Sequence, residues 1–365
     1  MITDTFLTTE ATEQWHLTLP ADTAVFGSLE FVRLSEQYRG FQGGLLVLRR
    51  GEDIVAYPLF LRPIANIPFA SAVCSAKFDA VTPEYTGPIV VRKSTDGGFD
   101  GFAARIHEFC LSTKIVAEFM HLNPWSDGKG LLIPQHLEVN REIVWVDTTM
   151  SDDELWNEQF SYACRKNIKR AQRENIHTFE ARSLADIHEF SRIYVQTMDR
   201  KEASSSYYFP LDYFVSIFEQ MKPNARFVMA EFSDRIVAAT LYLHDRSNVY
   251  SYLGGADHAY QQIRPTNAVV YDTIQWARRQ GKKRLVLGGG YEPEDGIYRF
   301  KSSFSQLRAA FHTYKYIHMP TEYEALAREW HAYHECDFPN STYFPVYRCS
   351  PGQQVKTAGS KKNIP

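Results

Sequence analysis

The sequence predicts an α/β protein of two halves, each a mixed, mostly antiparallel sheet flanked by helices. Three observations indicate this fold. The length of 365 residues exceeds the roughly 250 to 300 residues over which one hydrophobic core grows. A pattern of apolar and polar segments occurs twice along the chain. In the second half, helices are followed by strands with one helix inserted among them, an order typical of layered α/β folds.

The composition is that of an ordinary folded protein without a strong charge bias. Apolar residues make up 44% and charged residues 23%, which excludes disorder for most of the chain. The formal charge of -3 argues against a general nucleic-acid binder, and no DNA partner is expected. The cysteines lack any CxxC pair and are odd in number, so neither a disulfide framework nor a zinc site is indicated, and no metal is expected. They are Cys74, Cys110, Cys164, Cys336 and Cys349.

The N-terminal segment has no basic stretch followed by an apolar core. No apolar run approaches the roughly 20 residues that span a bilayer. We therefore expect a cytoplasmic protein without a transmembrane segment. Transient contact with the inner membrane surface is compatible with this if the acceptor is lipid-linked.

An internal repeat divides the chain. Residues 45–61 (LLVLRRGEDIVAYPLFL) and 227–243 (FVMAEFSDRIVAATLYL) share IVAxxLxL at an offset of 182, the difference between 45 and 227. Each copy is an apolar run, a polar turn and a second apolar run, which predicts a β-hairpin with buried strands. An amphipathic helix is expected after each hairpin, over residues 99–112 and 265–280. The repeat therefore predicts that the protein has two equivalent halves.

The remaining elements are predicted in order along the chain. Helices are expected over residues 152–175, 184–201 and 210–221, and strands near 227–232, 236–244, 248–253, 284–288 and 308–316. The domains are set at residues 1–150 and 151–330. Residues 331–350, rich in aromatics and proline, are expected to pack on the second domain as a strap. Residues 351–365 lack apolar content and are expected to form a loose tail.

Several short motifs then resemble a known family. They are Tyr85-Thr86-Gly87-Pro88, Arg165-Lys166-Asn167-Ile168-Lys169-Arg170-Ala171, Leu287-Gly288-Gly289-Gly290, Tyr298-Arg299-Phe300-Lys301-Ser302-Ser303-Phe304 and Tyr343-Phe344-Pro345-Val346-Tyr347-Arg348. In order and spacing they are similar to those of the FemABX members of the GNAT superfamily, over roughly residues 30 to 350. The resemblance implies tandem GNAT-like domains, a C-terminal catalytic half and acyl or aminoacyl transfer to an amine.

The donor stays open between acyl-CoA and aminoacyl-tRNA. FemABX proteins transfer amino acids from aminoacyl-tRNA to peptidoglycan precursors, and wider relatives use acyl-CoA. The long helical hairpin with heptad character that holds tRNA in some peptidoglycan members is not seen in this sequence. The acceptor that the resemblance implies is an amine-bearing molecule, either a nucleotide- or lipid-linked cell-envelope precursor or another sugar or peptide intermediate.

A donor site is expected where a strand ends and a helix begins in the second half. Gly254 and Gly255 follow the strand over residues 248–253, and glycine lets a ligand approach backbone N–H groups closely. The next helix starts at Pro265, and its free N–H groups suit an anion. A phosphate would face Gln262, Arg264, Thr266 and Asn267. The alternative is an ordinary helix start with polar surface residues.

The second expected site feature is the triple glycine together with Lys301. Gly288, Gly289 and Gly290 interrupt the chain after an apolar run, either to make room for a substrate or as a plain turn. Ile297, Phe300 and Phe304 can form one face of a short helix that leaves Lys301 pointing elsewhere. The resemblance implies that this lysine stabilises negative charge on the carbonyl or a phosphate, with Tyr298 nearby. We expect Lys301 and the glycines to meet in one pocket with the helix start at Pro265.

The remaining candidates are weaker. Arg165, Lys166, Lys169, Arg170 and Arg173 form one positive helix face, either solvated or in contact with a phosphate of tRNA, CoA or acceptor. Asp257 and Glu292 are the candidate general bases, beside His258, Glu294 and Asp295. No nucleophile motif such as GxSxG occurs, which favours direct transfer.

Two other functions fit the same sequence. One is a CoA-dependent N-acetyltransferase of a small metabolite. The other is a binding module without catalysis, because one half of a duplicated fold can lose its reaction.

Overall fold

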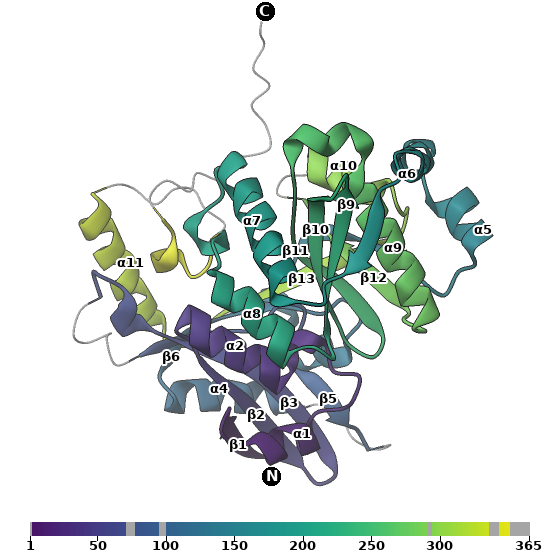
Figure 1. Ribbon diagram of the computed structural model, residues 1–365. Coiled ribbons are helices and arrows are strands. Elements are labelled where there is room, and N and C mark those ends of the chain that lie inside the picture. Colours follow the sequence, from purple (N-terminus) through teal and green to yellow (C-terminus); the bar gives the residue numbers. More distant parts are fainter. Residues whose placement is uncertain (1, 71–76, 95–99, 291–293, 336–342, 351–365) are drawn as a thin grey trace, which may run out of the picture. The chain divides into compact units, whose positions relative to one another are not determined.

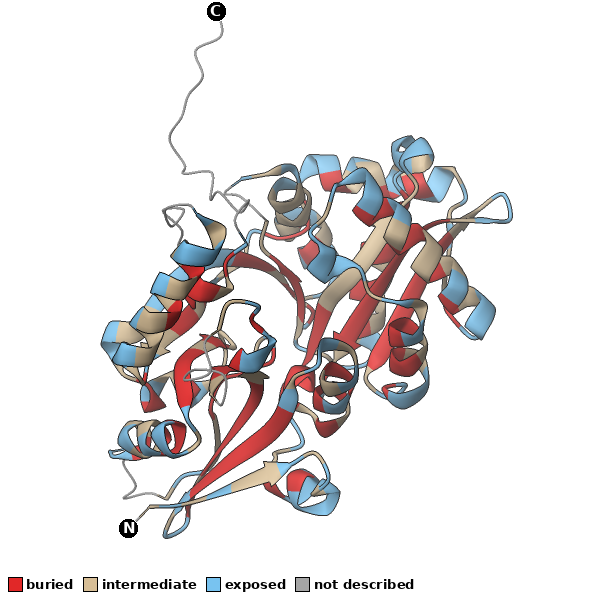
Figure 2. Ribbon diagram, turned by 90° about the vertical axis from the view of Figure 1, so that its left-hand side faces the viewer, coloured by how far each residue is buried: buried red, intermediate tan, exposed pale blue. Residues whose placement is uncertain are grey.

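The computed structural model describes residues 2–70, 77–94, 100–290, 294–335 and 343–350, which form two compact units. Unit 1 consists of Met1–Thr18, Arg39–Glu138 and His312–Pro365, and unit 2 of Leu19–Tyr38 and Val139–Phe311. The expected boundaries at residues 150 and 330 treat each half as continuous in sequence, whereas these units are interleaved. Figure 1 labels the helices and strands of both units, and Figure 2 shows that the strands are largely buried. Among the described residues, no helix is long and apolar enough to cross a membrane.

Unit 1 is built on a mixed sheet with strand order β1-β2-β3-β4-β6-β13, and β5 pairs with β3. All pairs are antiparallel except β4 with β6. The strands are β1 (Thr3–Thr8), β2 (Gln42–Arg50), β3 (Asp53–Pro63), β4 (Phe78–Val81), β5 (Ile89–Arg92), β6 (Ile115–His121) and β13 (Arg308–Ile317), of which the residues from His312 belong to unit 1.

Three helices accompany this sheet: α1 (Thr12–Thr18), α4 (Phe102–Ser112) and α11 (Pro320–His334). Helix α4 lies between β5 and β6 in the chain and buries Phe102, Ile106, Phe109 and Cys110. These four residues are the apolar stripe that the sequence predicts. Helix α4 therefore covers the core face of the unit 1 sheet.

The C-terminal strap packs on unit 1, which corrects the expectation that it covers the second domain. Tyr347 and Cys349 are buried with Trp330 of α11 in a small apolar cluster. The hydroxyl of Tyr347 and the guanidinium of Arg348 both donate to Asp79 of β4, which is 0% exposed. A buried charge needs hydrogen-bond donors, and the strap supplies two of them to Asp79. These bonds hold the strap on unit 1.

The strands of unit 2 follow the order β7-β12-β11-β10-β9-β8. β11 and β12 are parallel, and the other pairs are antiparallel. The strands are β7 (Leu137–Asp147), β8 (His177–Glu180), β9 (Ala225–Phe232), β10 (Arg235–His244), β11 (Asn248–Ala256) and β12 (Arg284–Gly288).

The helices of unit 2 are α2 (Leu29–Arg39), α5 (Asp152–Glu154), α6 (Tyr162–Arg173), α7 (Leu184–Arg200), α8 (Leu211–Gln220), α9 (Pro265–Arg279) and α10 (Gly296–Ser302). The single helix predicted over residues 152–175 is wrong. After α5 a π-turn covers Leu155–Gln159, Phe160 is extended, and the Ser161 side chain caps α6 by accepting the N–H of Cys164. The cap starts a new helix, so the segment is broken at Phe160.

The structure confirms the internal repeat as two copies of one arrangement. In unit 1, hairpin β2–β3 is followed by β4, helix α4 and β6, which is parallel to β4. In unit 2, hairpin β9–β10 is followed by β11, helix α9 and β12, which is parallel to β11. Each half is thus an α/β layer with a mixed, mostly antiparallel sheet.

Candidate active site

The parallel strands β11 and β12 separate toward their C-terminal ends. Their backbone pairing runs from Asn248 with Arg284 to Tyr250 with Val286, and within the described residues it stops there, although β11 continues to Ala256. The ladder between β11 and β10 shifts register next to Tyr242, which leaves one extra residue in β11 as a β-bulge. The open edge of β11 beyond the bulge can therefore offer backbone N–H groups to a ligand.

Gly254 and Gly255 lie inside β11, which corrects the expectation that the strand ends before them. A methyl group on Gly255 would lie 2.5 Å from Thr197 Oγ1 and 2.6 Å from the carbonyl oxygen of Ile193 in helix α7. The Thr197 hydroxyl also accepts the N–H of Ala256 at 3.0 Å. Gly255 is therefore required for the close approach of α7, and donor binding by the two glycines stays a prediction.

The start of helix α9 carries a buried side-chain amide, and the backbone N–H groups of Asn267 and Ala268 donate to the carbonyl oxygen of Arg264. Arg264 is the N-cap residue with φ 63° and ψ 43°, and Pro265 is the first helical residue. Asn267 is 4% exposed, and its Nδ2 has no hydrogen-bond partner among the described residues. Thr266 is half-buried, whereas Gln262 and Arg264 are exposed. Because the helix N-terminus is the positive end of the helix dipole and the Asn267 amide offers a donor, this end of α9 suits an anionic group.

The triple glycine and Lys301 are in direct contact. β12 ends at Gly288, whose φ of 80° favours glycine. Lys301 Nζ donates to the carbonyl oxygen of Gly289 at 2.7 Å, and the Arg141 guanidinium donates to that of Gly290 at 2.8 Å. A methyl group on Gly290 would lie 2.5 Å from Asp295 Oδ1. Gly290 therefore packs closely against the Asp295 carboxylate, and the Gly289 carbonyl oxygen holds Lys301 at the end of β12.

The environment of Lys301 disfavours its charged form. Burial lowers its pKa to about 8; Asp295 opposes this shift, and the positive charges of Lys201 and Arg141 add to it. Burial also lowers the pKa of Lys201, as does Arg200, again against the effect of Asp295. Asp295 thus acts on both lysines, and it also accepts the N–H of Tyr298 as the N-cap of α10, while Arg141 adds a third positive charge near Lys301. Such a site attracts a negatively charged ligand.

The candidate general bases differ in their surroundings, and no single one is assigned. Asp257 accepts the N–H of Ala259 at 3.0 Å and begins the short turn before α9. Glu292 lies outside the described residues, and Glu294 is exposed. The hydroxyl of Tyr298 accepts a hydrogen bond from Arg308 at 2.9 Å. The roles of these residues in proton transfer and binding stay predictions.

The basic face of α6 is partly used inside the unit. Arg165 donates to the carbonyl oxygens of Trp156 and Phe160 at 2.9 and 2.7 Å. Lys169 Nζ lies 5.6 Å from the centre of the Trp156 ring. These contacts hold the π-turn against α6. Two of the five basic residues of α6 therefore have a structural role.

Sequence reasoning missed Arg141 and Lys201. Arg141 lies in β7 and Lys201 follows α7, so both are far from the triple glycine in the sequence. Neither belongs to a motif or to an unusual run of residues. They join the site only through the fold, and no local signal could have identified them.

The part of the chain that contains the candidate site matches a known protein-family model. Residues 159–302 match the model described as "Acetyltransferase (GNAT) domain". Residues 159–302 are a GNAT domain. The GNAT domain contains β11, the start of α9, the triple glycine and Lys301, so the features described above lie within a family of acyltransferases.

Solved structures extend the likeness in fold to both units around the GNAT domain. The chain is similar to FemX with a TM-score of 0.67 and 12% identity, over 88% of this chain and 99% of that one. It is also similar to a conserved protein of unknown function from Bacteroides thetaiotaomicron, with a TM-score of 0.57 and 14% identity, over 86% and 99%.

A third likeness is to the C-terminal domain of a putative lysylphosphatidylglycerol synthetase from Agrobacterium fabrum. Its TM-score is 0.52 and its identity 12%, over 84% of this chain and 91% of that one. No curated protein sequence matches this chain significantly. In fold, the chain is a FemABX-like pair of GNAT-like halves.

Proposed function

We propose that this protein is an N-acyltransferase or aminoacyltransferase that acts by direct transfer onto the amine of a cell-envelope, sugar or peptide intermediate. One observation carries the proposal. β11 and β12 are parallel neighbours, so their C-terminal ends lie at the same edge of the sheet. Helix α9 begins at this edge, because it returns the chain from the end of β11 to the start of β12. The Lys301 contact with the glycines after β12 lies there too.

The chemistry follows from what this edge offers. The nitrogen of the acceptor amine attacks the donor carbonyl carbon, a C–N bond forms, and the bond to the leaving thiol or ribose hydroxyl breaks. The amine proton passes to a base or to water. Negative charge develops on the carbonyl oxygen, where N–H groups of β11 and the ammonium of Lys301 would stabilise it.

Direct transfer is supported by the state of Cys164. Burial raises the pKa of this thiol to about 12, and Cys164 is 0% exposed. A thiol that stays protonated and out of contact with solvent is a poor nucleophile. A covalent intermediate on Cys164 is therefore not part of the proposal.

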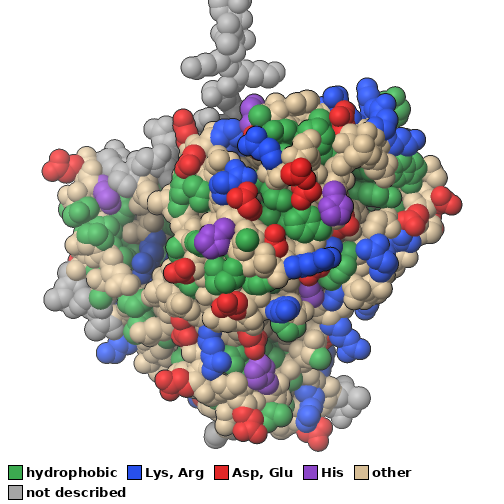
Figure 3. Space-filling view, viewed as in Figure 1, with side chains coloured by type: hydrophobic (Ala, Val, Ile, Leu, Met, Phe, Trp, Pro, Cys, Tyr) green, Lys and Arg blue, Asp and Glu red, His purple; other side chains and the backbone are tan. Residues whose placement is uncertain are grey.

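The donor is proposed to place a phosphate at the start of α9. Acyl-CoA and aminoacyl-tRNA share this chemistry. The engagement of Arg165 and Lys169 by Phe160 and Trp156 of the preceding segment favours acyl-CoA, because it leaves fewer cations for a long polyanion. On the face drawn in Figure 3, acidic and basic side chains are likewise interspersed. Both donors are cytoplasmic, and we propose that location for the reaction.

Donor binding tests the proposal. Acetyl-CoA or charged tRNA at 100 times its dissociation constant should stabilise the protein by about 2.7 kcal/mol, measured as a rise in melting temperature. Asn267→Ala should weaken binding roughly tenfold or more, since a hydrogen bond to a charged group contributes about 1.5–3 kcal/mol.

The exposed Asn66 of unit 1 provides a matched control, because Asn66→Ala should leave donor affinity unchanged. Stabilisation by tRNA alone would reverse the preference for acyl-CoA. If neither donor raises the melting temperature, the transferase proposal fails.

A further inference from the structure

Unit 1 contains a buried cluster of three different metal-ligating side chains. Cys110 comes from helix α4, Glu118 from β6, and His318 follows β13. One ligand atom of each, the sulfur, a carboxylate oxygen and a ring nitrogen, lies within 4.8 Å of the other two. The three residues are 1%, 1% and 5% exposed, respectively. This cluster lies outside the GNAT domain and has no part in the proposed transfer reaction.

The fold brings the three side chains to one point. Tyr316 of β13 pairs with Glu118 of β6, and the N–H of His318 continues this ladder by donating to Val116 at 2.9 Å. Alternate residues of a strand share a face, so His318 lies on the same face as Tyr316 and its partner Glu118. Helix α4 covers this face and directs Cys110 toward it.

We propose that Cys110, Glu118 and His318 form a binding site for a divalent transition-metal ion of the zinc type. His318 Nε2 lies 3.3 Å from Glu118 Oε2, which is long for a hydrogen bond. It matches the separation of about 3.3–3.5 Å between neighbouring ligands of a tetrahedral ion with bonds of about 2.0–2.2 Å. Thiolate and imidazole ligands, together with a carboxylate, are those that Zn²⁺ takes in proteins.

The electrostatics suit a divalent ion in a buried place. A thiolate and a carboxylate together neutralise two positive charges, so the loaded site carries no net charge into the interior. The Cys110 proton leaves to solvent when the sulfur binds. Without an ion, Cys110 is a free cysteine whose sulfur lies beside a buried carboxylate.

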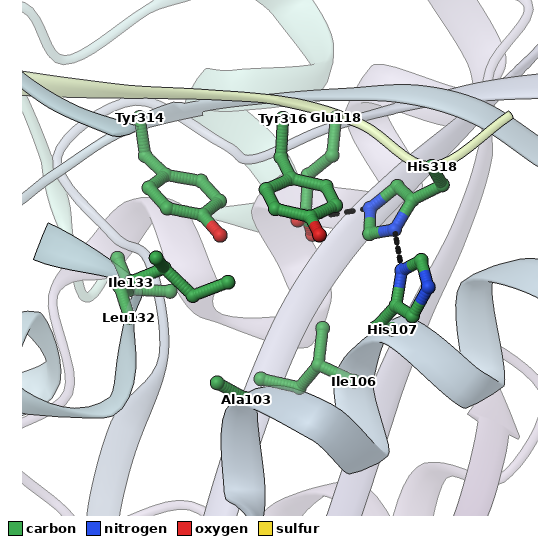
Figure 4. A pocket seen from close by; sticks show the side chains of 9 residues that line it. All are labelled: Ala103, Ile106, His107, Glu118, Leu132, Ile133, Tyr314, Tyr316 and His318. Carbon is green, nitrogen blue, oxygen red and sulfur yellow. Dashed lines mark hydrogen bonds and ion pairs between the residues drawn. The ribbon is translucent and has the colours of Figure 1, made fainter. Parts of the chain in front are cut away.

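Neighbouring residues orient the ligands. The Tyr57 hydroxyl donates to Glu118 Oε1, so that Oε2 is directed to the site. His107 Nδ1 lies 2.9 Å from His318 Nδ1, and this hydrogen bond fixes the His318 ring with Nε2 toward the ion (Figure 4). Partners of this kind are typical of metal-bound histidine and carboxylate ligands.

The proposed fourth ligand is a water molecule in the small pocket beside Glu118 and His318. Glu118 and His318 line a small pocket whose other walls include Leu132, Ile133, Tyr314 and Tyr316. In Figure 4 the tyrosine rings and His318 extend from one strand toward the helix that carries His107. Three protein ligands and one solvent position complete a tetrahedral site.

Metal binding to the tag-free full chain tests the proposal. After treatment with a chelator, the protein should take up about one equivalent of Zn²⁺, measured by elemental analysis after gel filtration. Addition of Co²⁺ to the unaltered protein should give the near-ultraviolet charge-transfer absorption of a cobalt–thiolate bond. This spectrum requires no substitution, so it remains decisive if a variant fails to fold.

Two variants and a control assign the ligands. Cys110→Ser and His318→Gln should each lower Zn²⁺ affinity at least tenfold, and Cys110→Ser should abolish the charge-transfer band. Cys164→Ser, which changes a buried cysteine of unit 2, should leave both signals unchanged. Absence of the band in the unaltered protein, or Zn²⁺ affinity that is the same in all four proteins, would overturn the proposal.

Discussion

Burial makes the charged form of the Lys301 side chain unfavourable, yet neighbouring groups hold this side chain in place. Burial disfavours the ammonium, Asp295 favours it, and the Gly289 carbonyl fixes its position. An ammonium held in a water-poor place stabilises a developing oxyanion more strongly than one in bulk water. The residue is therefore suited to charge stabilisation.

The Lys301 side chain should matter more for turnover than for stability. We expect Lys301→Ala to lower kcat roughly 100-fold or more, because it removes one donor to the oxyanion. The melting temperature should change little, since the substitution also removes a buried charge. Steady-state kinetics and thermal melts check this, with the exposed Lys222→Ala as control. Full activity of Lys301→Ala would contradict the assigned role.

The pH dependence of folding should carry the signature of the same lysine. Its folded-state pKa of about 8 lies below the ordinary value of 10.5. Below pH 8 the lysine is charged in both states, and its full burial cost is present. Between pH 8 and 10.5 the unfolded state binds more protons, so stability rises with pH. The free energy of unfolding, measured in urea at pH 7.5 and 9.5, should rise more for the unaltered protein than for Lys301→Met; an equal change in both would refute the lowered pKa.

At the scale of elements, the contact between helix α7 and strand β11 depends on one missing side chain. Gly255→Val would place a branched side chain against the Ile193 carbonyl and Thr197 Oγ1. Overpacking of this kind costs roughly 1–3 kcal/mol. Urea unfolding should show this loss. A Cβ added at Gly130 would meet no heavy atom within 4 Å, so Gly130→Ala should unfold at nearly the same urea concentration as the unaltered protein. An unchanged midpoint for Gly255→Val would mean that α7 can move away freely.

The elements themselves were predictable where one periodicity governed a segment. Helices α7, α8 and α9 and strands β9 to β12 begin and end within a few residues of the predicted ranges, whereas β7 and β8 were not predicted. The break at Phe160 was missed because Leu155, Cys164, Ile168 and Ala171 are all buried, so the apolar pattern continues across it. A local capping bond decided the structure there, and the longer pattern concealed it.

At the scale of the molecule, the site was only partly accessible to sequence reasoning. The Lys301 contact with the glycines lies within one short segment, and the motifs around it made it predictable. Arg141, Lys201 and the Cys110–Glu118–His318 cluster arise from residues far apart in the chain. Their proximity is a product of sheet topology, which no local pattern encodes.

The strap connects distant parts of unit 1 through one carboxylate. Asp79 receives hydrogen bonds from Tyr347 and Arg348, and Arg62 lies 3.6 Å away. We expect Arg348→Met to lower the free energy of unfolding by roughly 1–3 kcal/mol, because it removes a charged donor from a buried acceptor. Arg328→Met, which breaks an exposed pair with Glu324, should cost less than about 1 kcal/mol. Equal losses in the two variants, by chemical denaturation, would show that the strap adds no stability.

The interleaving of the two units also determines the order in which the protein can mature during synthesis. All residues of unit 2 have been made once Phe311 is added, whereas unit 1 still lacks His312 and everything after it. The part translated first is thus the part completed last. Until the segment from His312 onward is made, the N-terminal strands lack the pairing of β6 with β13 and the partners of Asp79, so their apolar surface is exposed to aggregation.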